Sequence, residues 1–600
     1  MLGPELELNI SVSEQTLTSL SFADHTSVAI KQWVKELPMA NIGETSRQLY
    51  QAIIELNKLM VAPNIRSQLL EVLREPIHYA CQELSKHFLN QSIVLSEKQQ
   101  KIANLTQALQ IHLANGYKAV MKDATSNISN EKIKKLFSCA AHRMMSEYGR
   151  VLLRAHQLYI PPPKELWLDM HRVFKFSETM NLLKYIITDT ENKHQIETRI
   201  DQAYKQNLLL NCCRPNQLRQ SDIQLVYEAF EIWSDYVEAG SEYSANAVFI
   251  INMEQDSPPR YRSLMHSSLT EHYYGFDTAE LVDRLTEHLS ALQQKQGDGS
   301  SHLTSPKGVS DVLINHLNQA FGILTKRTFK RIANHGSLNL CVGLSASHFY
   351  ASGEVEFHTQ MLHRNASNIE SDENIFLTQP RRQGDAWSGA YDTGGHSSAS
   401  QSSPLGADIS FDRPVNKADE SYPHYAIPLI NTSPGGYCLQ WVGDVPKNIQ
   451  AGELISLRET INQPWSVAVI RWIRHIKKKG TQIGIELLAP NAQPCGVQLL
   501  HRTGDPSEFL RGMLLPELSS IGQPATLITP RLPFQSGHKV SIRLSETESK
   551  CQLEQRVSAT ASFSQFELSE SIQIMGKSVQ ANETTSHDKE DDFDSLWPTL

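Results

Sequence analysis

Apolar residues recur at spacings of three and four throughout the first half of the chain. Three such series run from Leu49 to Met60, from Leu70 to Leu84 and from Ile102 to Leu113. This spacing places one apolar stripe on each of several helices. The triple proline at 161–163 cannot lie inside a helix and predicts a rigid turn between two subdomains. We therefore expect residues 1–291 to form a helical domain, as a bundle or an array.

The pattern changes after a polar Gly/Ser/Pro linker at 292–306 and one further helical stretch. Short runs rich in branched and aromatic residues follow, separated by turn signals such as PGG, QAG and KKKG. The runs are SLNLCVGLSASHFY, HYAIPLINTS, GYCLQWV, ELISLRE, WSVAVIRWIRHI and TQIGIELL. Several short strands at this spacing predict a small barrel. PATLITPRL, HKVSIRLSE and SIQIM predict an additional small β-unit over 500–575, and VFIINM at 248–253 is a local strand-like exception in the helical half.

Two segments are too polar to form a core. Residues from about 364 to 420 contain GDAWSGAYDTGGHSSASQSSPLGAD, which predicts a disordered insertion within the β-domain. Residues 576–600 predict a disordered acidic tail. Its DDFDSLW stretch combines acids with apolar side chains, so it either docks in the groove of a partner or only solubilises the chain end.

Length and composition indicate a soluble protein of the α+β class with several domains. The 600 residues exceed what one core can organise, and 40% are hydrophobic while 20% are charged. The net charge of -9 argues against a general polyanion binder, although one small basic site remains compatible with it. The eight cysteines form no CxxC pair, which favours a reducing compartment. With no signal peptide and no membrane-spanning run, we expect a cytoplasmic protein without membrane insertion.

The first candidate binding motif is KRTFKR at 326–331, in which four of six side chains are cationic. Arg327 and Arg331 are four residues apart, immediately before the first expected strand. The planar fork of an arginine can pair with a phosphate or with the O6/N7 edge of guanine. The plainer interpretation is the basic C-terminal end of a helix.

The second motif is NTSPGG, which runs from Asn431 to Gly436 and enters a strand. Asn431 and Ser433 supply short polar side chains that can bond a base edge or a phosphate oxygen. Gly435 and Gly436 remove side-chain bulk and allow close approach of a ligand to the backbone. Alone, this stretch would also be compatible with an ordinary turn.

RxxxR at 327–331 followed by NxSxxG at 431–436 resembles the signature of the PilZ domain family, and the order of the strands agrees over about 320–490. The resemblance implies a PilZ-like six-stranded antiparallel β-barrel within 307–499. It also implies that Arg327, Arg331, Asn431, Ser433 and Gly436 bind cyclic di-GMP. The gap between the motifs is longer than usual in the family, and the 364–420 insertion accounts for most of the excess. GLSASH at 343–348 contains a serine in an expected strand but lacks the Asn and the final Gly.

The resulting hypothesis is a non-enzymatic receptor that passes the cyclic di-GMP signal to an unidentified protein partner, through the helical half or the acidic tail. The alternatives are an interaction scaffold with a degenerate barrel and, less favoured, an RNA-binding barrel; nucleic acid is an unlikely partner. Trp465, Trp472 and Arg471 could form a stacking surface, although barrel core is the commoner place for strand aromatics. No catalytic set, metal motif or cofactor motif is present, and His335, His348, His358 and His363 form no metal-binding pattern.

Overall fold

The computed structural model describes residues 8–569, with the exception of 245–246, 266–269, 271, 294–302, 323–331, 334–335, 363–421, 434, 461–462, 477–478, 502–506, 518–523 and 545–546. The expected insertion, the expected acidic tail and most of the expected linker therefore lie outside the described residues. The chain divides into two compact units. The helical unit comprises 1–328 with 443–445 and 473–481, and the barrel unit comprises the remainder.

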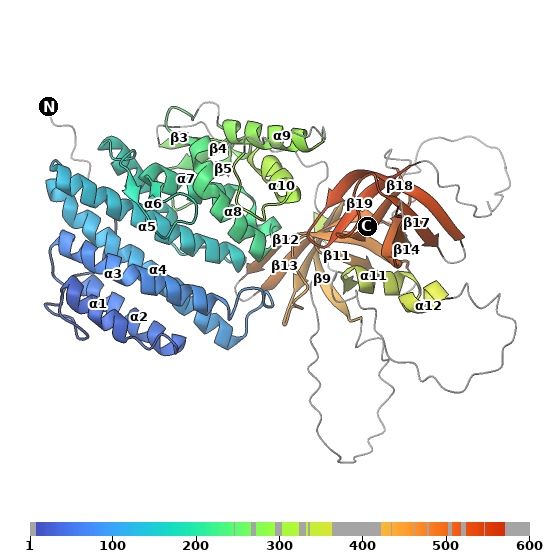
Figure 1. Cartoon of the computed structure of the whole chain (residues 1–600), viewed down its shortest axis with the longest axis horizontal. Coiled ribbons are helices and arrows are strands. Elements are labelled where there is room, and N and C mark those ends of the chain that lie inside the picture. Colours follow the sequence, from blue (N-terminus) through green and yellow to red (C-terminus); the bar gives the residue numbers. More distant parts are fainter. Residues whose placement is uncertain are drawn as a thin grey trace, which may run out of the picture. The chain divides into compact units, whose positions relative to one another are not determined.

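Long helices form most of the helical unit, and α4 packs along both α3 and α5 (Figure 1). The helices are α1 (Ser27–Glu36), α2 (Ile42–Lys58), α3 (Pro63–Ser85), α4 (Glu97–Ala124), α5 (Glu131–Gln157), α6 (Leu166–Thr179), α7 (Ile200–Cys212), α8 (Gln220–Trp233), α9 (Ala279–Gln293) and α10 (Asp311–Phe321). The predicted stripe from Leu70 to Leu84 is buried, whereas Met60 follows the end of α2 and is 50% exposed. The triple proline lies in the turn between α5 and α6.

The helical unit also contains strands. The expected run at 248–253 forms β4 (Phe249–Asn252) of an antiparallel sheet with order β3-β6-β4-β5. The other members are β3 (Glu238–Gly240), β5 (Arg260–Tyr261) and β6 (Tyr273–Asp277). Their two- to five-residue lengths explain why periodicity did not reveal them. Two short antiparallel strands of two residues each, β1 (Ile187–Thr188) and β2 (Glu197–Thr198), pair with each other, and β1 contacts α5.

A buried ionic cluster joins α3, α5 and the residue that follows β1. Arg74 donates to both carboxylate oxygens of Asp189, at 2.6 and 2.9 Å, and to Glu147 at 3.0 Å. Arg143 Nη1 lies 3.0 Å from Asp189, and His78 Nε2 lies 2.8 Å from Glu147. All five side chains are less than a tenth exposed. Such a cluster stabilises the fold only while every charge keeps its partner.

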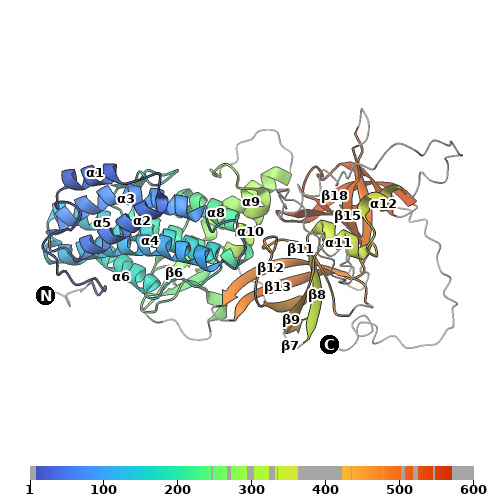
Figure 2. The same ribbon diagram turned by 90° about the horizontal axis from the view of Figure 1, so that it is seen from below.

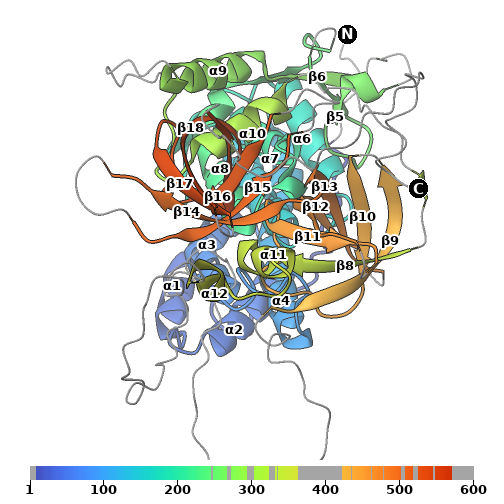
Figure 3. The same ribbon diagram turned by 90° about the vertical axis from the view of Figure 1, so that its right-hand side faces the viewer.

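The first barrel of the barrel unit confirms the predicted PilZ-like strand series. Its strands are β8 (Ser337–Val342), β9 (His424–Ser433), β10 (Gly436–Trp441), β11 (Leu454–Arg458), β12 (Ser466–Ile476) and β13 (Gly480–Ala489). The order β10-β13-β12-β11-β8-β9 is closed by pairing between β9 and β10, as Figure 3 shows. The additional strand β7 (Ile332–Ala333) pairs with β9 on the same edge as β8.

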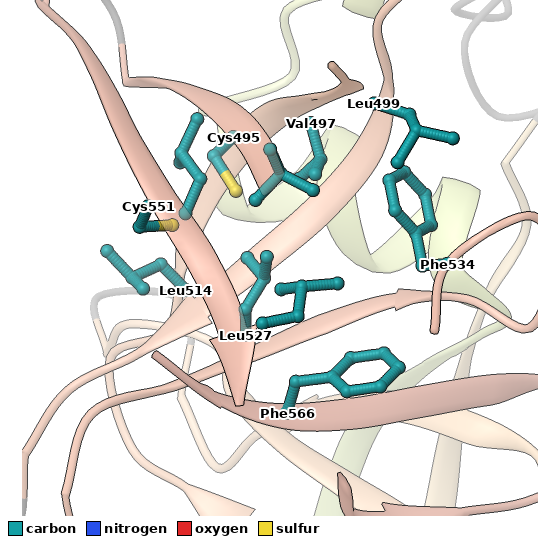
Figure 4. Packing of buried hydrophobic residues seen from close by; sticks show 11 residues of the cluster. Cys495, Val497, Leu499, Leu514, Leu527, Phe534, Cys551 and Phe566 are labelled. Carbon is teal, nitrogen blue, oxygen red and sulfur yellow. The ribbon is translucent and has the colours of Figure 1, made fainter. Parts of the chain in front are cut away.

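The second barrel is closed in the order β14-β15-β16-β19-β18-β17. Its strands are β14 (Gln493–Leu499), β15 (Leu510–Leu515), β16 (Thr526–Pro530), β17 (Lys539–Leu544), β18 (Thr547–Ala559) and β19 (Phe563–Leu568). Cys495 and Cys551 are buried in its apolar core with Leu514, Leu527 and Phe566 (Figure 4). The stretch SIQIM lies outside the described residues. The expected boundary at 499/500 would assign β14 to the first barrel. In the structure β14 pairs with β15 and β17 and therefore belongs to the second barrel.

One expected strand continuation is wrong. GLSASH, which was expected to prolong the strand from Ser337, forms the start of helix α11 (Leu344–Ala351), and α12 (Phe357–Leu362) follows. Gly343 ends the ladder with an N–H bond to the Leu454 carbonyl oxygen at 2.8 Å. Its φ of +91° then turns the chain into the helix, a conformation open to glycine. Leu344 contributes to a core shared by both barrels, together with Leu454, Val467, Val469, Ala489, Ala492, Met513, Leu515, Ile528 and Phe563.

Candidate ligand-binding site

The NTSPGG motif forms the tight hairpin between β9 and β10. Ser433 pairs with Gly436, and Asn431 pairs with Cys438, in antiparallel register. Asn431 and Ser433 are half-buried, whereas Thr432 between them is 3% exposed. This alternation follows from the two-residue period of a strand and separates the two polar side chains from the interior. Ser433 Oγ donates to the Gly436 carbonyl oxygen at 3.2 Å.

Gly436 lies against the backbone of β13. Its φ is +152°, and a Cβ at this position would lie 2.1 Å from the Ile485 carbonyl oxygen and 3.1 Å from the Glu486 Cα. The Leu487 N–H donates to the Gly435 carbonyl oxygen at 3.1 Å, which holds the turn against the same strand. The glycine is therefore required by packing of the barrel itself, in addition to any role in binding.

Strand β7 connects the basic motif to the hairpin. Ile332 pairs with Thr432, and Ala333 pairs with Asn431. β7 and β8 lie along β9 in Figure 2, so the chain enters the barrel directly at the NTSPGG motif. Arg327 and Arg331 themselves lie outside the described residues. Of the five predicted site residues, the structure brings Asn431, Ser433 and Gly436 together.

Strands β12 and β13 carry further polar and aromatic groups close to this hairpin. Arg471 Nε donates to the Glu486 carboxylate, and both side chains are about half exposed. The Trp472 ring covers Gly484, where any side chain would collide with the indole. The nearness of Glu486 to Gly436 arises from pairing of β10 with β13, which joins residues about fifty positions apart. Nothing local in the sequence could have indicated Glu486.

Trp465, Trp472 and Arg471 do not form one exposed stacking surface. Trp465 is buried against Tyr350, with ring centroids 5.0 Å apart, and Arg458 lies over its ring at 4.4 Å. Trp465, the residue before β12, thus belongs to the core beside α11, as was expected for an aromatic residue of this run. Trp472 and Arg471 remain partly exposed.

Burial also shifts the pKa of Tyr437, a residue of β10 beside the hairpin. Tyr437, which pairs with Thr432, is 7% exposed, and its hydroxyl lies 3.5 Å from the Glu459 carboxylate. Burial and the neighbouring carboxylate raise the pKa of Tyr437 to about 12, so its hydroxyl stays protonated at neutral pH. Among the described residues, no group of three or more His, Cys, Asp or Glu side chains suits a metal ion. The described helices include none long and apolar enough to cross a bilayer.

Comparison with known proteins covers nearly the whole chain. Three family models of the cyclic-di-GMP receptor FimW match it: the N-terminal domain at 28–242, the middle PilZ domain at 248–494 and the C-terminal β-barrel domain at 495–571. The cyclic-di-GMP receptor FimW of Pseudomonas aeruginosa is 40% identical to it, over 99% of each chain. This chain belongs to the FimW family. No solved structure matches it.

Membership confirms the resemblance to PilZ domains and extends it. The sequence supported the likeness only over about 320–490, whereas the relative aligns with the helical half and the second barrel as well. The middle family model begins at 248, within the four-stranded sheet that clusters with the helical unit.

Proposed function

We propose that this chain is a receptor for cyclic di-GMP and that the dinucleotide binds at the β9–β10 hairpin. Arg327, Arg331, Asn431, Ser433 and Gly436 form the site in this proposal. Its support is the likeness to a protein named as a cyclic-di-GMP receptor and the PilZ match over the hairpin. The structural observation that carries it is the pairing of β7 with β9.

The register limits how far the arginines can lie from the hairpin. Arg331 precedes Ile332, which pairs with Thr432 in the middle of the motif. Consecutive α-carbons are about 3.8 Å apart, and five residues span at most about 18 Å. Arg331 is therefore one peptide bond from the paired strand, and Arg327 is within reach of the same surface.

Each group has a distinct task in this site. The two guanidinium forks pair with the guanine edges and phosphates, which carry the negative charge of the ligand. Asn431 and Ser433 offer short donors and acceptors from the same strand. Gly436 lets the hairpin lie against β13, which fixes the position of Asn431 and Ser433. Binding brings the segment with Arg327 and Arg331 against the hairpin, because the ligand interacts more favourably with that arrangement than with any other.

The receptor acts by binding and not by turnover in this proposal, and it passes the signal to a protein partner through the helical unit or the acidic tail. We place it in the cytoplasm. None of the eight cysteines forms a disulfide. Burial raises the thiol pKa of Cys81 and Cys495, as expected of side chains that serve as packing groups in a reducing compartment.

Calorimetric titration of the full chain with cyclic di-GMP tests the proposal, with GTP and cyclic di-AMP as competitors. We expect saturable binding of cyclic di-GMP alone. Arg327→Ala and Arg331→Ala should each weaken it about tenfold or more, the effect of one lost charge-assisted hydrogen bond. Arg543→Ala is the matched control, because this arginine pairs with Glu548 in the second barrel.

The titration also separates the alternatives. A scaffold with a degenerate barrel would bind no cyclic di-GMP. An RNA-binding barrel would bind many RNA sequences, with an affinity that falls steeply as salt rises. Unchanged affinity in both arginine variants would overturn the proposed site.

A further inference from the structure

The helical unit contains a cavity of about 690 Å³ beside the edge strand β5, remote in sequence from the hairpin site. This volume is within the range of roughly 300–1,000 Å³ typical of small-molecule sites. Its walls come from the end of α7, the loop that follows it, β4, β5 and the start of β6. Phe249, Ile250 and Pro259 are buried and form an apolar floor.

Two arginines give the cavity a positive charge. Arg214 is fixed: its Nε donates to the Tyr261 hydroxyl at 2.9 Å, and its Nη2 donates to the Gln319 carbonyl oxygen at 3.2 Å. The same tyrosine donates to the Ala320 carbonyl oxygen at 2.6 Å, so the guanidinium is held by two elements. Arg260, on β5, is exposed at the rim. None of the described residues that line the cavity is acidic.

Two acids of the neighbouring loop, Glu254 and Asp256, contact groups outside the cavity lining. Glu254 lies 2.8 Å from His272 Nδ1. Asp256 accepts the backbone N–H groups of Glu165 and Trp167, at 2.6 and 3.1 Å, and so caps α6. Within the described part of the wall, no carboxylate neutralises the positive charge of the cavity, which favours an anionic ligand.

The remaining polar lining is made of amides. Asn211, Asn252 and Gln255 contribute side chains that both donate and accept. Asn252 Oδ1 already accepts the Glu254 N–H at 3.0 Å, which leaves its amide hydrogens for a ligand. Amides of this kind read the hydrogen-bonding edge of a heterocyclic base, and the half-exposed Tyr273 ring offers a stacking face.

We propose that this cavity binds a nucleotide, with the phosphate on Arg214 and Arg260 and the base on the amides and Tyr273. A simple carboxylate would use the arginines and the apolar floor but leave the three amides without partners. The combination of arginine, amide and ring is the recognition chemistry of a base joined to a phosphate. This site is independent of the hairpin site.

Titration of the full chain with GMP, AMP and UMP, and with inorganic phosphate alone, tests the inference. We expect at least one nucleotide to bind, and inorganic phosphate to bind about tenfold more weakly or less, because it gains nothing from the amides and the ring. Arg260→Ala should weaken nucleotide binding about tenfold. Leu264→Trp, at a 59% exposed position of the rim, should block the cavity without changing charge.

Two controls fix the location. Arg284→Ala should leave affinity unchanged, since this arginine pairs with Glu280 outside the cavity. The double variant Asn431→Ala with Ser433→Ala, which is expected to lose cyclic di-GMP, should keep the nucleotide. The inference is overturned if none of the three nucleotides binds, if phosphate binds equally well, if both cavity variants retain full affinity, or if the hairpin double variant abolishes binding. If cyclic di-GMP did not bind, the proposed function would fail, but the proposal of a nucleotide site in the cavity would be unaffected.

Discussion

Gly436 and Ile485 meet through their backbones, with room for no side chain between them: a Cβ on the glycine would lie 2.1 Å from the carbonyl oxygen. Because the obstacle is backbone in a paired strand, Gly436→Ala must displace β10 from β13. We expect a loss of about 1–3 kcal/mol in the stability of the barrel unit, together with weaker cyclic di-GMP binding. Urea unfolding followed by circular dichroism measures the first effect, and calorimetry measures the second.

Gly537→Ala is the control for this prediction. Its φ is +85°, but nothing lies within 4 Å of its Cβ position. It therefore carries only the backbone penalty, about 1 kcal/mol. Equal losses in the two variants would mean that contact with β13 contributes nothing.

Ser433→Ala should separate binding from folding. Within the described residues, the half-buried Oγ donates a hydrogen bond to the Gly436 carbonyl oxygen of the same hairpin, so stability should change by about 0.5 kcal/mol or less. Cyclic di-GMP affinity should fall about tenfold. Thr432→Val is the matched control, because this neighbour is buried and its Oγ1 has no hydrogen-bond partner among the described residues. An equal loss of affinity in Thr432→Val would indicate a general distortion of the hairpin.

The Arg471–Glu486 ion pair predicts an electrostatic influence on the same site. Glu486 places a carboxylate on the strand that Gly436 touches, close to where an anionic ligand would bind. Glu486→Gln should raise cyclic di-GMP affinity severalfold, and Arg471→Ala should lower it. Both side chains are about half exposed, so added salt should diminish both effects. A lower affinity in Glu486→Gln, a higher affinity in Arg471→Ala, or effects that persist at high salt would contradict this interpretation.

The buried ionic cluster predicts loss of helical-unit stability in acid. Burial opposes ionisation of Glu147, but His78 and Arg74 outweigh it and hold the Glu147 pKa at about 2; the two arginines also hold the pKa of Asp189 well below its usual range. Depressed pKa values contribute stability that is present above the unfolded-state values, near 4, and is lost as the pH falls towards those of the folded state. Unfolding measured between pH 5 and about pH 2 should show this loss.

Asp189→Asn tests the same cluster at neutral pH. It leaves Arg74 and Arg143 without a full countercharge, and we expect a loss of about 3–5 kcal/mol. Glu280→Gln, in an exposed pair with Arg284, should change stability by less than about 1 kcal/mol. A cluster variant as mild as this control would show that solvent reaches the buried charges.

The strands of the first barrel were predictable because most are short runs rich in branched and aromatic residues that end at clear turn signals. The run from His424 and the run from Trp465 correspond to β9 and β12 within a residue at their starts. The failure at GLSASH has a local cause: alternation ends at Gly343, and a positive φ that only the backbone reveals redirects the chain. In the second barrel, β18 was missed because most of its residues are exposed and polar.

The sequence could predict the site residues that belong to one local motif. It could not predict the residues that approach the motif only when the barrel closes. Asn431, Ser433 and Gly436 belong to one hairpin, so a motif could identify them. Glu486 and Ile485 approach Gly436 only through long-range pairing of β10 with β13. The cavity beside β5 is likewise assembled from segments between 211 and 273 that share no motif.

The apolar core around Leu344 determines how this protein can be divided for experiments. Leu454 and Val467 of the first barrel pack there with Met513 and Phe563 of the second. A fragment that ends after β13 would leave the first two facing water and would be prone to self-association. Dissection should therefore keep both barrels in one piece, and we expect a substitution at Met513 or Phe563 to disturb the first barrel through this core.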